Sequence, residues 1–113
     1  MKKFYNEIPE MTFFIGDTLP IFTIKVKNQD IEKCTMKMVI SRVKPPKEVV
    51  IERECLKGKT AEGEDCFLFH LWSEITEKLT AGTYRISFIM TDDIKLEYIK
   101  LSGLMHVRSL SGG

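Results

Sequence analysis

The sequence has no long apolar run, no excess of charge and few cysteines, and each shortage excludes a class of protein. The 113 residues carry 17 Lys plus Arg against 16 Asp plus Glu, and a net charge of +1 would attract neither nucleic acid nor anionic lipid. No stretch approaches the ~20 apolar residues of a membrane span. Asn6, Glu7, Pro9 and Glu10 interrupt the start of the chain, where a signal peptide needs about 7–15 apolar residues. We therefore expect a protein that is made in the cytoplasm and contacts neither nucleic acid nor membrane.

The three cysteines, Cys34, Cys55 and Cys66, are an odd number with no close pair, which makes a poor disulfide framework. We expect them to behave as small buried hydrophobic residues. Cys66 and His70 suggest a metal site, but on a strand that rises about 3.3 Å per residue they stand roughly 13 Å apart. A zinc ion with ligands at ~2 Å cannot bridge that distance, so the sequence predicts no metal site.

Most of the chain alternates apolar and polar residues with a period of two, which is typical of strands with one buried face. The clearest alternation covers residues 22–27, 34–41 and 84–91, with less regular apolar runs at 11–15, 48–56, 66–72, 95–101 and 104–107. Turn residues separate these runs every 8–15 positions or so, which favours a sandwich over βαβ units. The sequence therefore predicts an all-β fold: an antiparallel immunoglobulin-like β-sandwich of seven to nine strands with at most one short helical turn. We expect the sandwich over residues 11–108, after an N-terminal arm at 1–10 and before a flexible tail at 109–113. The last two runs form either a strand pair or one strand broken by Gly103.

Only residues 73–79 resemble a helix, and they span about two turns. We expect Ser73 to cap this turn, Ile75 and Leu79 to point inward, and Thr76 to point outward. The preceding run at 66–72 is apolar on both faces, which predicts a central strand. The single tryptophan, Trp72, could be a binding anchor, but next to Leu71 in such a strand a core position is the expectation.

The segment from Leu79 to Tyr84 has the form Leu-x-x-Gly-x-Tyr and directly precedes a predicted strand. In immunoglobulin-like sandwiches a tyrosine at such a corner sends its hydroxyl back to the backbone upstream. Gly82 would supply the sharp backbone bend. We therefore predict a structural corner formed by Leu79, Gly82 and Tyr84.

No pattern of catalytic or cofactor-binding residues stands out. Gly58-Lys59-Thr60 matches the end of a phosphate-binding loop, but Arg53 occupies the position of the required first glycine and no apolar helix follows. Neither histidine lies in a predicted turn, and no nucleophile elbow precedes a helix. The sequence therefore predicts no catalytic residues, no cofactor and no enzyme.

Three motifs resemble the N-terminal immunoglobulin-like domain of the phage baseplate upper protein family. They are the box Ile15-Gly16-Asp17-Thr18 before a strand, the helical turn that ends in Leu-x-x-Gly-x-Tyr at residues 73–84, and the closing strand that begins Gly103-Leu104. The resemblance covers roughly residues 11–107, although the last hairpin turns at Asp92-Asp93 and not at a glycine-rich loop. It implies a non-catalytic structural or assembly module of a phage or prophage virion, associated with the tail or baseplate. Its partners would be other virion or tail proteins, or a second copy of itself.

A bacterial immunoglobulin-like adhesion or carbohydrate-binding module is the alternative function. That function predicts an exposed aromatic platform, which the sequence does not reveal.

Residues 48–56 read as an edge strand, and an unprotected edge can pair with another chain. Val49, Val50 and Ile51 follow Pro45-Pro46 as a bare apolar patch, which makes them candidate interface residues. The alternative is that Val49 and Ile51 face the core and only Val50 is exposed.

Overall fold

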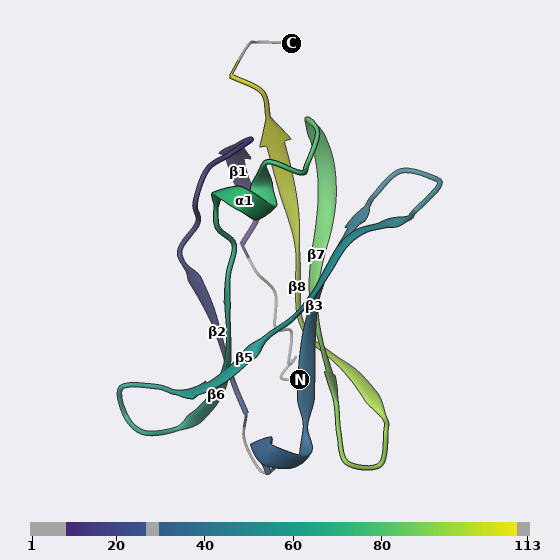
Figure 1. The fold of residues 1–113 in the computed structure, drawn as a ribbon. Coiled ribbons are helices and arrows are strands. Elements are labelled where there is room, and N and C mark those ends of the chain that lie inside the picture. Colours follow the sequence, from purple (N-terminus) through teal and green to yellow (C-terminus); the bar gives the residue numbers. More distant parts are fainter. Residues whose placement is uncertain (1–8, 27–29, 111–113) are drawn as a thin grey trace, which may run out of the picture.

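The computed structural model describes residues 9–26 and 30–110, which form a sandwich of two β-sheets (Figure 1). The larger sheet has the order β1-β8-β7-β3-β4, with β1 (Met11–Phe14), β3 (Thr35–Arg42), β4 (Val49–Glu54), β7 (Gly82–Thr91) and β8 (Glu97–Arg108). The smaller has the order β2-β6-β5, with β2 (Ile21–Lys25), β5 (Leu56–Lys59) and β6 (Asp65–His70). One 3-10 turn, η1 (Ile31–Lys33), and one short helix, α1 (Ser73–Thr76), complete the described elements. The predicted all-β sandwich of seven to nine strands is confirmed.

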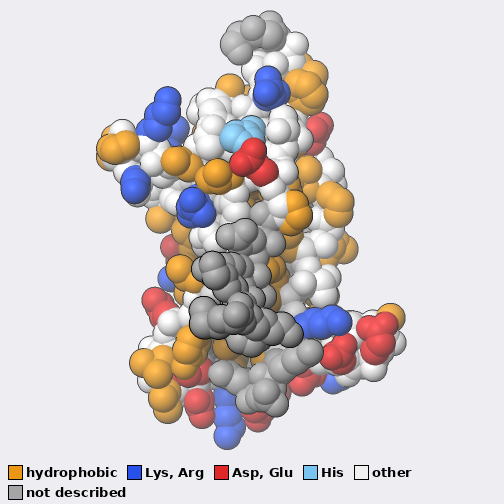
Figure 2. Space-filling model, turned by 180° about the vertical axis from the view of Figure 1, so that it is seen from behind, with side chains coloured by type: hydrophobic (Ala, Val, Ile, Leu, Met, Phe, Trp, Pro, Cys, Tyr) orange, Lys and Arg blue, Asp and Glu red, His pale blue; other side chains and the backbone are white. Residues whose placement is uncertain are grey.

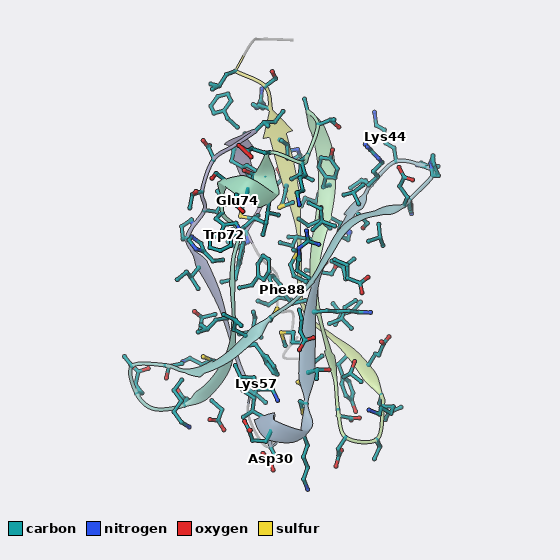
Figure 3. All side chains as sticks on the ribbon, in the orientation of Figure 1. Asp30, Lys44, Lys57, Trp72, Glu74 and Phe88 are labelled. Carbon is teal, nitrogen blue, oxygen red and sulfur yellow. The ribbon has the colours of Figure 1, made fainter. Side chains whose placement is uncertain are left out.

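The alternating apolar residues meet between the two sheets. On the larger sheet, Met38 and Ile40 of β3 lie opposite Phe88 and Ile86 of β7, and all four side chains are buried. Phe88 is central: its ring centroid lies 5.3 Å from that of Phe22 and 6.3 Å from that of Phe69, which belong to the smaller sheet (Figure 3). Aromatic pairs at these centroid distances and tilts stabilise a fold by more than the buried area of the rings accounts for. The ring contacts of Phe88 therefore help to hold the two sheets together.

Two strands differ from the expectation. Residues 48–56 do not form one edge strand: β4 ends at Glu54, and β5 begins at Leu56 in the other sheet. Between them, Cys55 is buried and its amide donates to the carbonyl of Met36 at 2.8 Å. β8 is one continuous strand through Gly103, so the last two runs are neither a strand pair nor a strand broken by Gly103. The larger sheet is not wholly antiparallel as predicted, because β1 pairs with β8 in parallel. The other described strand pairs of the two sheets are antiparallel.

The helical turn is anchored by side chains that the sequence interpretation assigned differently. Trp72, not Ser73, stands at the N-cap, and it makes no side-chain cap bond. Thr76 is fully buried and not outward, because its hydroxyl donates to the carbonyl of Asp17 at 2.7 Å. The hydroxyl of Thr18 accepts from the amide of Ser73 at 3.1 Å. The turn therefore packs on the segment between β1 and β2.

The ends of the chain are described in part. Residues 1–8 of the predicted N-terminal arm and residues 111–113 of the predicted tail lie outside the described residues. Ser109 and Leu110 follow β8, and the side chain of Leu110 is exposed. Within the described part, no helix has the length and apolar character needed to cross a membrane.

Candidate functional site

The Tyr84 corner is a closed hydrogen-bond arrangement. Tyr84 is 1% exposed, and its hydroxyl donates to the carbonyl of Thr80 at 2.8 Å. The same hydroxyl accepts from the amide of Thr80 at 3.2 Å and lies 3.0 Å from its side-chain oxygen. Gly82 has φ of 154°, and Leu79 is buried in the core. These contacts join β7 to the segment that follows the helical turn. Leu79, Gly82 and Tyr84 therefore have a structural role and present no reactive group to solvent.

The predicted interface residues do not form an apolar patch. Ile51 is 5% exposed and lies opposite Ile40 in the core, and Val50 is partly buried against the core. Only Val49, at 54%, is exposed. Neither alternation proposed for this segment is right, because the pairing with β3 shifts between Ile40 and Ser41, and such an irregularity changes which face each residue occupies. β4 is nevertheless one of the two edge strands of its sheet among the described strands.

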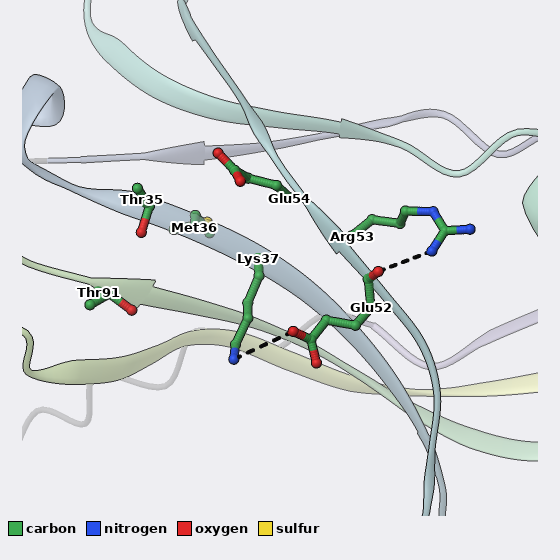
Figure 4. Close-up of a pocket in the computed structure, with 7 residues that line it drawn as sticks. All are labelled: Thr35, Met36, Lys37, Glu52, Arg53, Glu54 and Thr91. Carbon is green, nitrogen blue, oxygen red and sulfur yellow. Dashed lines mark hydrogen bonds and ion pairs between the residues drawn. The ribbon is translucent and has the colours of Figure 1, made fainter.

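A shallow pocket of about 310 Å³ lies beside the second half of β4 (Figure 4). Lys37 and Glu52 pair across it at 3.7 Å, and the guanidinium of Arg53 donates to the carbonyl of Glu52 at 3.0 Å. Both partners of the ion pair are well exposed, so it contributes about 0–1 kcal/mol. The pocket lining offers no nucleophile placed beside a base, and its charges of both signs largely neutralise one another.

The outer face of the smaller sheet carries an exposed apolar surface that sequence reasoning missed. We call Ile21, Leu56, Leu68, His70 and Trp72 the small-sheet patch. Trp72 is not in the core but 51% exposed, and its ring centroid lies 5.9 Å from that of His70. Figure 3 shows Trp72 on the outer side of the smaller sheet. The central position of β6 was predicted correctly, but a second layer does not cover its outer face in the described structure.

The members of the small-sheet patch are neighbours by strand register. His70 of β6 lies opposite Ile21 of β2, and Leu68 of β6 lies opposite Leu56 of β5. Leu56 is 73% exposed and Ile21 58%. Leu68 lies over Gly58, where an added Cβ would come within 2.8 Å of the Leu68 Cδ1 atom. Glycine at position 58 therefore lets the Leu68 side chain lie flat on the sheet.

Charges of both signs lie on the surface of the molecule. The view from behind shows charged side chains of both signs, with several Lys and Arg side chains close together at the upper left (Figure 2). Ion pairs such as Lys25 with Glu64 and Lys59 with Asp65 use up part of this charge at the surface. With a net charge of only +1, the surface gives little long-range electrostatic steering.

The three cysteines are buried thiols. Burial, reinforced by the nearby Glu54 carboxylate, raises the pKa of Cys55 to about 12. Burial and the Asp92 carboxylate raise the pKa of Cys34 as well. Thiolate is the nucleophilic and metal-binding form, so both environments oppose that chemistry. Among the described residues no group of three or more His, Cys, Asp or Glu side chains converges in a way that could hold a metal ion.

The β7–β8 hairpin is organised by one carboxylate. Asp92 accepts from the amides of Ile94 at 3.1 Å and Leu96 at 2.9 Å, and from the hydroxyl of Tyr98 at 2.9 Å. Burial alone would raise the pKa of Asp92, but these hydrogen bonds outweigh it and hold the pKa below its usual value. The Asp92-Asp93 turn is therefore a structured loop, although it lacks the glycines of the family pattern.

No family model matches the sequence. No curated protein matches it either. Among solved structures the chain is similar to CopC from Methylosinus trichosporium OB3b, with 9% identity and a TM-score of 0.45 over 86% of this chain and 83% of that one. A likeness at this level says nothing about function.

Proposed function

We propose that this chain is a non-catalytic assembly module of a phage or prophage virion, associated with the tail or baseplate, which binds another virion protein through the small-sheet patch. The virion context comes from the motif resemblance. The docking surface comes from one observation: Ile21, Leu56 and Trp72 are all more than half exposed on the outer face of one sheet.

Exposure of this kind has a physical cost that a partner would remove. Fully burying a large aliphatic side chain is worth about 1.5–3 kcal/mol relative to leaving it in water. Contiguous exposed apolar surface on a soluble domain commonly marks a protein contact. Tryptophan is among the residues most enriched at the energetic centre of interfaces. The Trp72 ring lies next to that of His70, and His70 in turn lies opposite Ile21 of the patch.

Substitution on two different surfaces tests this proposal. The chain is co-expressed with the products of neighbouring tail or baseplate genes, and complexes are measured by light scattering. Leu56→Lys should abolish association and leave folding intact, because the side chain is already 73% exposed. Val49→Lys is the matched control, since Val49 is also exposed but lies on β4 of the other sheet.

If Val49→Lys disrupts the complex and Leu56→Lys does not, the docking surface is the β4 edge and the patch assignment is wrong. If the chain binds none of these gene products, the virion function itself is wrong.

The adhesion or carbohydrate-binding alternative gains one specific observation. Trp72 and His70 form an exposed aromatic pair, which is the kind of platform that such a module requires. Trp72 is the only tryptophan, so its fluorescence reports this site alone. Titration with cell-wall oligosaccharides should leave the fluorescence unchanged if the patch binds protein. A saturable change that Trp72→Ala abolishes would favour the carbohydrate function.

A further inference from the structure

The two ends of the larger sheet carry opposite charge. Thr35 at the start of β3 pairs with Thr91 at the end of β7, so the β3–β4 loop and the β7–β8 turn lie at opposite ends of the sheet (Figure 1). Residues 42–48 contain three basic side chains and a single carboxylate, whereas residues 92–97 contain three carboxylates and a single lysine. We call the first segment the basic loop and the second the acidic tip.

The basic loop leaves two lysines available. Its ends are closed by Arg42 and Glu48, whose side chains form an ion pair at 3.1 Å and whose backbones share a hydrogen bond at 3.0 Å. Lys44 and Lys47 are exposed, and neither forms an ion pair with another described residue. The Pro45-Pro46 pair between them is exposed as well. Figure 3 shows Lys44 at this loop, away from the space between the sheets.

The acidic tip has the complementary composition. Its turn is held by the Asp92 carboxylate, which accepts three hydrogen bonds from within the hairpin. Asp93 and Glu97 are exposed, and neither pairs with a cation among the described residues. Ile94, at 67%, and Leu96, at 52%, are exposed between them. The tip therefore presents two carboxylates around an apolar centre, where the loop presents two ammonium groups around two prolines.

We propose that the acidic tip of one copy docks on the basic loop of a second copy, so that the chain associates head to tail. Opposite charges around the contact set its orientation, whereas two loops or two tips would bring like charges together. The apolar centre of the tip leaves water in the contact. Both segments are already held by hydrogen bonds within their own turn, so docking needs little further ordering.

Such a contact joins two different surfaces and is therefore open-ended. A copy that binds through its tip still offers its own basic loop, and further copies add until a ring closes or a filament forms. The small-sheet patch lies on the other sheet and stays free for a different partner. The inference therefore does not depend on the proposed virion function, and each can fail without the other.

Sedimentation velocity of the full chain over a range of concentrations tests the association. The weight-average mass should rise with concentration beyond twice the 13.1 kDa of one chain. Association should weaken when NaCl is raised from about 0.1 M to about 1 M, because the Debye length falls from about 10 Å to about 3 Å.

Charge reversal tests the two segments. The loop variant Lys44→Glu/Lys47→Glu and the tip variant Asp93→Lys/Glu97→Lys should each weaken self-association by about tenfold or more, because like charges then meet. All four residues are exposed, so both variants should fold. A chain with both pairs reversed should associate again, because an acidic loop then meets a basic tip.

The matched control is Lys57→Glu/Lys78→Glu. It makes the same change in net charge as the loop variant at two exposed lysines outside both segments. Its self-association should follow that of the wild type.

Four results would overturn the proposal. A mass that stays at that of the monomer up to about 1 mM would show that the copies do not associate. A mass that levels off at the dimer would show a symmetric contact. Failure of the fourfold reversal to restore association would show that loop and tip do not meet. Loss of self-association in Leu56→Lys, with none in the charge reversals, would show that the copies meet through the small-sheet patch.

Discussion

The Tyr84 corner gives the sharpest stability prediction. Tyr84→Phe keeps the buried ring, which packs in the core and lies under the Arg42 guanidinium at 5.7 Å from the ring centroid, and removes only the hydroxyl. That hydroxyl donates to the carbonyl of Thr80 and accepts from its amide. Without it, both backbone groups lose this partner in a partly buried place, which costs about 1–3 kcal/mol. For a domain of this size the melting temperature should fall by roughly 4–20 °C.

Thermal denaturation followed by circular dichroism measures this loss. Tyr98→Phe is the matched control, because it removes the same atom from a tyrosine whose hydroxyl bonds the Asp92 side chain in the hairpin and not backbone in the core. Its melting temperature should fall by less. A Tyr84→Phe variant that melts with the wild type would refute the reasoning, since the corner bonds would then contribute nothing that water does not replace.

Further predictions concern the backbone, the helical turn, acid stability and metal. Gly82→Ala should cost about 1–3 kcal/mol through its positive φ alone, because the added Cβ meets no atom within 4 Å, and an unchanged urea midpoint would contradict this. Thr76→Val should cost about 1–3 kcal/mol, because the carbonyl of Asp17 loses its donor, and urea denaturation checks it. The lowered pKa of Asp92 stabilises the fold above pH 3.8, and this contribution should disappear as the pH falls from there through the lowered pKa. Asp92→Asn should therefore weaken the acid dependence of the melting temperature in this range, and parallel curves would contradict the assignment. A chelator should leave the melting temperature unchanged, and elemental analysis with one zinc per chain would overturn the expectation of no metal.

Alternation predicted the fold where one strand face is buried without interruption. Residues 84–91 alternate apart from Ile89, and the buried side chains of β7 are those that the period of two assigns to the core. The pairing of β1 with β8 in parallel could not be predicted in this way, because alternation reports which face is buried and not which strand lies alongside. The sequence also did not reveal that the chain passes from one sheet to the other at Cys55. A buried residue fits the alternation of apolar and polar residues whichever sheet the next strand joins.

The two errors about surface residues have a common origin. Alternation was extended through Val49, Val50 and Ile51, but an irregularity in the pairing with β3 broke it there. At residues 66–72 an apolar pattern on both faces was interpreted as burial on both faces. The inner residues Phe67 and Phe69 are buried as expected, whereas Trp72 on the outer side is exposed. Apolar character shows that a residue favours burial but not whether its own chain supplies the cover.

Three residues from the motifs that carry the family resemblance make hydrogen bonds within the fold. The carboxylate of Asp17 accepts from the amide of Phe14, the hydroxyl of Thr18 accepts from the amide of Ser73, and Tyr84 closes the corner that follows the helical turn. Asp17, Thr18 and Tyr84 thus each have a structural reason to be where they are. Ile21, Leu56 and Trp72 have none, because their exposed side chains add little to the core and favour burial against something else. The function of this chain is therefore best sought on the outer face of the smaller sheet, where no part of the fold requires apolar residues.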